Sequence, residues 1–155
     1  MGLGHELATK ESQRINHQNA DREWMLFCHR LLKTETRSFF DRLVEHIESE
    51  VRDFCNVLGK QTVVCQRESE NYLLIRGNRD SSDRVHLVLS PDRQVITIER
   101  EEIDHLSVDM RRSKSEVRLT VELLDGQTFV TSDVGNAESL SRAILLPLLS
   151  GNKSN

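Results

Sequence analysis

The chain has 155 residues, of which 37% are hydrophobic and 30% charged, and its formal net charge is -4 at pH 7. A chain of this length fits one domain and buries roughly 70% of its unfolded surface, so a hydrophobic core can hold it without disulfides or metals. The negative charge argues against a general nucleic-acid-binding protein, because such domains are usually basic.

The cysteines and the apolar runs indicate a cellular compartment. Cys28, Cys55 and Cys65 are odd in number and lack paired spacing, which is typical of a reducing environment rather than of a disulfide framework. The N-terminus lacks the apolar region of a secretory signal, and the longest apolar run, AILLPLLSG, is too short to cross a bilayer. We therefore predict a cytoplasmic protein with no membrane span.

Residues 1–18, MGLGHELATKESQRINHQ, carry scattered apolar residues without a sustained period. Chain ends of this kind are often mobile, so we predict a mobile tail, with a helical tail that docks on a partner as the alternative. A single domain is then expected to cover residues 19–151, followed by a loose C-terminus at residues 152–155.

A long helical region follows this tail. From Asn19 to Leu58 the chain contains no glycine or proline, the residues that most often interrupt a helix. The first part, DREWMLFCHRLLK, has one apolar face, and Asn19 or Asp21 can cap it by accepting a hydrogen bond from a first-turn amide. That face carries Trp24, Phe27, Cys28, Leu31 and Leu32.

The second part, TRSFFDRLVEHIESEVRDFCNVLG, has the clearest helical period in the chain. Its apolar residues follow alternating steps of four and three: Phe40, Val44, Ile47, Val51, Phe54 and Leu58. Thr36 is a candidate N-cap, and Gly59 stands where a left-handed residue often ends a helix. Whether the two parts form one helix or bend near residues 33–36 is left open.

The four-three rhythm fits either a coiled-coil seam or a helix that packs on its own domain. Phe39, Leu43 and Cys55 widen the stripe beyond a two-position seam, and the pattern covers fewer than three heptads. We favour packing onto the domain's own core and keep helix-mediated dimerisation as the alternative.

After Gly59 the apolar period changes from helical to two, which indicates strands. Three pairs of alternating segments flank short polar turns: TVVCQR and NYLLIRG, DRVHLVLS and RQVITIER, and HLSVDM and EVRLTVELL. Asp125-Gly126 is the strongest hairpin signal, because both residues of a tight two-residue turn need a positive φ. We predict an antiparallel meander of six to seven strands between Gln61 and Ser132, forming a curved sheet or an open barrel.

The segment NAESLSRAILLPLLSGNKSN predicts a C-terminal helix. Asn136 can cap it, and Pro147 is expected to kink it or end it early, because proline lacks the amide hydrogen that a helix needs. A long helix, an antiparallel meander and a second helix together predict an α+β domain in which one or both helices cover one face of the sheet.

The basic segment between HLSVDM and EVRLTVELL is the most distinct candidate for binding chemistry. Its cations, Arg111, Arg112 and Lys114, could attract a phosphate or another anion. Asp109 and Glu116 flank these cations, however, and the whole chain is negative. We favour a solvated hairpin turn whose charges keep the sheet from associating with others, and we keep a weak anion site as the alternative.

No motif for catalysis, a metal or a cofactor is evident, so none is predicted. The acidic segment IEREEIDH gathers Glu99, Glu101, Glu102, Asp104 and His105. Strand alternation sends its carboxylates to different faces, which disfavours a magnesium or calcium site. A metal site assembled from Cys65, His86 and His105 has no support in their spacing.

Two hypotheses of different classes follow. The first is a non-catalytic protein-interaction or regulatory module whose N-terminal helical region dimerises or docks on a protein partner. Its predicted interface residues are Trp24, Phe27, Phe40, Val44, Ile47, Val51 and Phe54. The alternative is a small-ligand-binding protein or enzyme with a pocket between the curved sheet and a helix. Its candidate polar anchors are Tyr72, Arg76, His86 and Arg118.

Overall fold

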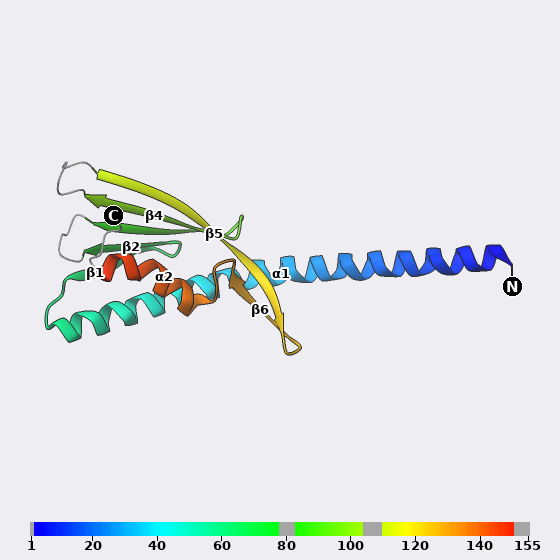
Figure 1. Cartoon of the computed structure of the whole chain (residues 1–155), viewed down its shortest axis with the longest axis horizontal. Helices are drawn as coiled ribbons and strands as arrows, with labels where there is room; N and C mark the ends of the chain where they lie inside the picture. The colour runs from blue at the N-terminus through cyan, green and yellow to red at the C-terminus, as the bar shows by residue number, and fades with distance from the viewer. Residues whose placement is uncertain (1, 78–82, 104–109, 151–155) are drawn as a thin grey trace.

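The computed structural model describes residues 2–77, 83–103 and 110–150. In chain order, its elements are a long helix α1 (Leu3–Leu58), six strands and a C-terminal helix α2 (Ala137–Leu149). Helix α2 and the C-terminal half of α1 lie against a curled antiparallel sheet, while the N-terminal half of α1 extends away from this body (Figure 1). The architecture is therefore α+β, as the sequence predicts.

Helix α1 is continuous through residues 33–36, where the sequence leaves a bend open. At 1.5 Å per residue, its 56 residues form a rod roughly 84 Å long. The predicted N-caps at Thr36 and at Asn19 or Asp21 are wrong, because all three residues lie inside the helix. The Thr36 hydroxyl instead donates to the carbonyl of Leu32, one turn earlier. A capping residue without a preceding breaker therefore does not start a new helix here.

The two ends of α1 differ in how well the sequence predicts them. At the C-terminal end, Gly59 has a φ of 73° and its amide donates to the carbonyl of Cys55 at 2.9 Å, which confirms the predicted helix end. At the N-terminal end, the helix begins at Leu3. Residues 3–18 are thus helical and continuous with the rest of α1, while mobility of the tail and its docking on a partner stay predictions.

The sheet is a meander in which each strand pairs antiparallel with the next, in the order β1 to β6. The strands are β1 (Val63–Ser69), β2 (Tyr72–Gly77), β3 (Arg84–Ser90), β4 (Val95–Ile103), β5 (Met110–Leu124) and β6 (Gln127–Ser132). Strand β5 pairs with β4 through its first part and with β6 through its second part. This long strand carries the sheet around the helices, and the result is an open half-barrel (Figure 1).

One predicted hairpin turn is confirmed, and one predicted strand lies mostly outside the described residues. Between β5 and β6, Asp125 and Gly126 have φ values of 52° and 77°, which confirms the predicted two-residue hairpin. The predicted strand HLSVDM lies at residues 105–110 and falls almost entirely outside the described residues. Six strands are present in the described part of the chain, within the predicted six to seven.

Helix α2 begins at the predicted position but does not end at the proline. The side chain of Asn136 accepts a hydrogen bond from the amide of Ser139 at 2.8 Å, which confirms the predicted cap. Pro147 lies in the last turn, and the helix ends at Leu149. The helix thus continues past Pro147, and the predicted early end at this residue is wrong.

A side chain of the sheet compensates for this proline. Because Pro147 has no amide hydrogen, it cannot donate to the carbonyl of Ala143, four residues earlier. The guanidinium of Arg100, on β4, donates to the carbonyls of Ala143 at 3.4 Å and of Ile144 at 2.8 Å. Burial lowers the pKa of Arg100, and nearby Glu102 partly opposes that effect. Arg100 thus connects the inner face of the sheet to the end of α2.

The hydrophobic core lies between the concave face of the sheet and the two helices. The side chains that α1 contributes are Phe39, Phe40, Leu43, Val44, Ile47 and Val51, and those of α2 include Leu140, Ile144 and Leu145. The strands contribute alternate residues such as Leu73, Ile75, Val85, Leu87, Ile96 and Ile98. The wide apolar stripe of α1 therefore packs on the domain's own core, as its width predicts.

Candidate functional site

The N-terminal half of α1 has almost no contact with the packed body. From Leu3 to Arg30 every side chain is exposed except that of Cys28, which is partly buried. Packing against the core begins at Leu31 and Leu32, which are partly buried against it. We call residues 3–30 the projecting segment; at 1.5 Å per residue its length is roughly 42 Å (Figure 1).

Two aromatic side chains lie next to each other on the projecting segment. The rings of Trp24 and Phe27 are stacked, with centroids 5.8 Å apart and an interplanar angle of 25°. Trp24 is 45% exposed and Phe27 is 38% exposed. With Ala20 and Leu31 they follow steps of four, three and four, so all four lie on one side of the helix. We call these four residues the aromatic stripe.

The charges of the projecting segment balance. Four acidic residues (Glu6, Glu11, Asp21 and Glu23) stand with four basic residues (Lys10, Arg14, Arg22 and Arg30). Glu11 pairs with Arg14, and Asp21 lies 3.5 Å from His17. Among the described residues, neither Glu23 nor Arg30 has an ion-pair partner. These two charges are available to another molecule.

The structure separates the predicted interface residues into two groups. Phe40, Val44, Ile47 and Val51 are at most 6% exposed and belong to the core. Phe54 is partly buried against the same core. Their four-three spacing serves packing within the chain, so of the predicted interface only Trp24 and Phe27 lie on an exposed surface.

The basic segment does not form the predicted turn. Residues 111–115 lie inside β5, because β4 and β5 pair as far as Ile103 and Met110. Each cation of the segment stands opposite a carboxylate: Arg111 opposite Glu102, Arg112 opposite Glu101, and Lys114 opposite Glu99. Cross-strand pairs of opposite charge stabilise a sheet, which explains why the strands continue where apolar alternation stops. The anion site stays a prediction, and its cations face an acidic strand.

The predicted polar anchors lie on the outer face of the sheet. Leu73, Ile75, Val85 and Leu87 point into the core, and so do Val117 and Leu119. Side chains alternate along a strand, so Tyr72, Arg76, His86 and Arg118 point the other way. These four residues therefore do not line a pocket between the sheet and the helices. The small-ligand alternative itself stays a prediction.

On that outer face, three of the side chains form a hydrogen-bonded chain. The Tyr72 hydroxyl bonds to Nδ1 of His86, and Nε2 of His86 lies 3.2 Å from a carboxylate oxygen of Glu101. Burial raises the pKa of Tyr72, and Glu68 adds to this effect, so the phenol stays protonated at neutral pH. These hydrogen bonds join side chains of β2, β3 and β4 across the outer face of the sheet, and we assign them a structural role.

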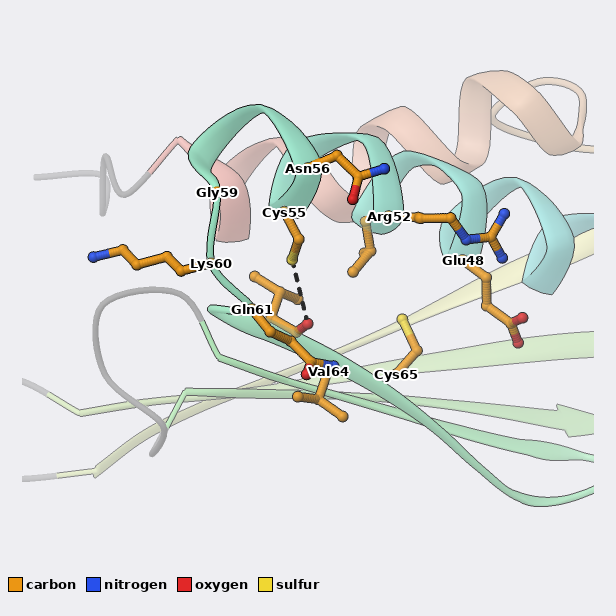
Figure 2. Close-up of a pocket in the computed structure, with 11 residues that line it drawn as sticks. Glu48, Arg52, Cys55, Asn56, Gly59, Lys60, Gln61, Val64 and Cys65 are labelled. Carbon is orange, nitrogen blue, oxygen red and sulfur yellow. Dashed lines mark hydrogen bonds between the residues drawn. The ribbon is translucent and has the colours of Figure 1, made fainter.

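A groove lies where the end of α1 approaches strand β1 (Figure 2). Its volume is about 630 Å³, and its lining includes Glu48, Arg52, Cys55, Asn56, Lys60, Val63 and Cys65. Within the groove the Cys55 thiol donates to the carbonyl of Val63 at 3.7 Å (Figure 2). Outside its lining, Arg67 donates to the carboxylate of Asp41 at 2.7 Å. Strand β1 is thus connected to α1 at one point inside the groove and at one point outside it.

Strand β1 offers backbone groups to this groove. The amide of Gly77 donates to Asp83 at 2.9 Å, so Gly77 directs its backbone toward β3. Val63 stands opposite Gly77, and backbone groups alternate in direction along an antiparallel pair. Val63, Cys65 and Arg67 therefore direct their backbone groups away from β2. In the described residues β1 pairs with β2 alone, which makes it an edge strand of the sheet.

Of the two cysteines in the groove, Cys65 is not suited to nucleophilic catalysis. Burial raises the pKa of Cys65 to about 12, and Glu48 and Cys55 add to the effect. Because the thiolate is the reactive form, a thiol with this pKa is almost entirely inactive at neutral pH. The structure thus gives no support for a thiol active site at Cys65.

The metal site that the sequence does not support, Cys65 with His86 and His105, has no support from the described residues either. Cys65 stands opposite the inward-facing Ile75, whereas His86 is on the outer face, so the sheet separates the two; His105 lies outside the described residues. In the acidic segment IEREEIDH, Asp104 also lies outside the described residues. Within residues 2–77, 83–103 and 110–150, no group of three or more His, Cys, Asp or Glu side chains is arranged to hold a metal.

Comparison of the chain with models of protein families, with curated proteins and with solved structures found no match. Neither helix in the described part of the chain has a stretch that is both long and apolar enough to cross a membrane.

Proposed function

We propose that this protein is a non-catalytic interaction module that binds a protein partner through the projecting segment of α1. The observation that carries the proposal is the aromatic stripe, because Trp24 and Phe27 are stacked and exposed on a helix outside the packed body. Tryptophan is among the residues most enriched at the energetic centres of protein interfaces. An amphipathic helix that presents such a stripe fits a groove or another helix of a partner.

The stability of the segment supports the same proposal. Isolated helices are marginal in water, because most helical stability in proteins comes from packing of an apolar face. The projecting segment packs almost nothing against its own body. A protein partner would supply the missing contact. The three free cysteines are consistent with a reducing compartment, and we propose a cytoplasmic location for this interaction.

The test is site-specific photocrosslinking in the cell that produces the protein. A photoreactive phenylalanine analogue at Phe27 is expected to capture a defined partner, and its mass identifies that partner. The matched control is the same analogue at Leu26, which is 54% exposed. Residues 24 and 26 differ by about 200° around the helix axis, so Leu26 faces away from the stripe. Equal labelling at both positions, or no defined product, overturns the proposal.

A second candidate function is small-ligand binding in the groove between α1 and β1, favoured by its volume of about 630 Å³. Native mass spectrometry of protein purified gently from its source would show a small additional mass. Asn56→Trp fills the groove and should remove that mass, while Val57→Trp, at a neighbouring residue that is 87% exposed, should retain it. Equal masses in both variants and the wild type count against the groove.

A further inference from the structure

We infer that the partner of the aromatic stripe is the same stripe of a second copy of this chain, which packs antiparallel about a two-fold axis between Trp24 and Phe27. This inference rests on the proposed function and names its partner. Three properties of α1 support it: the order of large and small side chains along the stripe, the position of two unpaired charges beside it, and the exposed side of the helix that continues from it.

The order of side chains favours the antiparallel arrangement. In a two-fold antiparallel pair centred between Trp24 and Phe27, Trp24 lies opposite Phe27 of the second copy, and Ala20 lies opposite Leu31. The small side chain thus meets the large aliphatic one, and the aromatic side chains form the two central layers. In a parallel pair every residue would meet its own copy, and the two Ala20 side chains would leave a gap.

The charges beside the stripe select the same arrangement. Glu23 directly precedes Trp24, and Arg30 directly precedes Leu31, so both lie on the same flank of the stripe. In an antiparallel pair this flank of one helix faces the same flank of the second copy, which brings Glu23 of each copy near Arg30 of the other. Because of the two-fold axis, the dimer contains two such contacts. Both side chains are exposed and have no ion-pair partner among the described residues.

The side of α1 that continues the stripe is open to a second helix. Thr34, Ser38, Glu45 and Ser49 follow Leu31 on that side, and all four are exposed. The projecting segment of the second copy would extend along this polar side beyond the stripe. Its own N-terminal part is polar as well, with equal numbers of acidic and basic residues in the segment as a whole. The chain's negative charge therefore does not oppose this contact.

A charge exchange tests both the partner and the arrangement. Sedimentation equilibrium on the full chain is expected to show a monomer–dimer equilibrium. Glu23→Arg and Arg30→Glu each turn two attractive contacts into two repulsive ones, so each should weaken the dimer roughly tenfold or more. The double variant Glu23→Arg/Arg30→Glu restores the pairs and should return the dissociation constant to near the wild-type value. Circular dichroism confirms that the exposed substitutions leave the fold intact.

The outcomes are separable from those of the proposed function. A chain that is monomeric at all concentrations, while photocrosslinking at Phe27 captures a different protein, overturns the second-copy inference and leaves the interaction module standing. A dimer whose double variant is no stronger than the single variants overturns the antiparallel arrangement. A dimer unaffected by Trp24→Ala shows that the stripe is not the contact, and this also overturns the inference.

Discussion

The two halves of α1 should respond very differently to removal of a large apolar side chain. Ile47 is fully buried in the core, whereas Trp24 is 45% exposed on the projecting segment. Ile47→Ala removes buried methyl and methylene groups and leaves a cavity, which costs about 2–5 kcal/mol in other proteins. Trp24→Ala removes a side chain that has little contact with the body and should cost about 0.5 kcal/mol or less.

These free energies translate into a measurable difference in denaturation. With a urea m-value of roughly 2 kcal/mol/M, a loss of about 3 kcal/mol lowers the midpoint by about 1.5 M. That loss is a large fraction of the 5–15 kcal/mol that typically stabilises a domain, so Ile47→Ala should also unfold at a much lower temperature. Urea titration followed by circular dichroism measures both variants against the wild type.

The protein concentration must be low in this experiment. If the stripe associates, binding stabilises the folded state by mass action, and Trp24→Ala would then lose that contribution at high concentration. At low concentration only the intrinsic stability is compared. An Ile47→Ala variant that loses under 1 kcal/mol, or a Trp24→Ala variant that loses as much as Ile47→Ala, would refute the division of α1 into a packed half and a projecting half.

Two further predictions concern the body of the domain. Arg100→Met keeps an unbranched apolar stem but removes the donors to the carbonyls of Ala143 and Ile144, so urea titration should show a loss of about 1–3 kcal/mol. The pKa of Cys65 is raised from 9.0 to about 12, so its protonated thiol contributes stability below pH 9 that is lost as the pH rises toward 12. Cys65→Ala should therefore lose less stability between pH 9 and pH 11 than the wild type, and equal losses would contradict this assignment.

Local patterns predict most of the fold because each reflects a requirement of a short segment. Gly59 ends α1 since a left-handed residue is needed there, and Asp125-Gly126 forms the tight hairpin for the same reason. Asn136 caps α2 by satisfying an amide within its own first turn. Such signals depend only on neighbours in the chain, and each of them is confirmed.

The basic segment shows where local patterns stop. Arg111 and Lys114 have no apolar alternation, so the sequence favours a turn at this point. In the structure they extend β5 because β4 places Glu102 and Glu99 opposite them. That register depends on two strands distant in the chain, and no pattern within either strand alone specifies it.

The candidate sites depend even more on the whole fold. Phe40 and Trp24 both lie on apolar faces of the same helix, and the sequence assigns both to one interface. Which of them is covered depends on where the sheet ends along α1, and only the assembled half-barrel decides this. The groove beside Cys65 likewise exists because β1 is an edge strand, a property of the sheet order rather than of β1.

The continuity of α1 connects its packed half to the function we propose. Starting a helix is the unfavourable step, because several residues must be ordered for the first hydrogen bond, whereas each further residue adds one bond. The half of α1 buried in the core supplies that start, so the projecting segment needs only to propagate from Leu31 toward Leu3. The body thereby lowers the cost of forming the helix that carries Trp24 and Phe27. A partner that binds this helix has to meet only part of the entropy cost of folding it from a disordered chain, and less of the gross binding energy is lost on association.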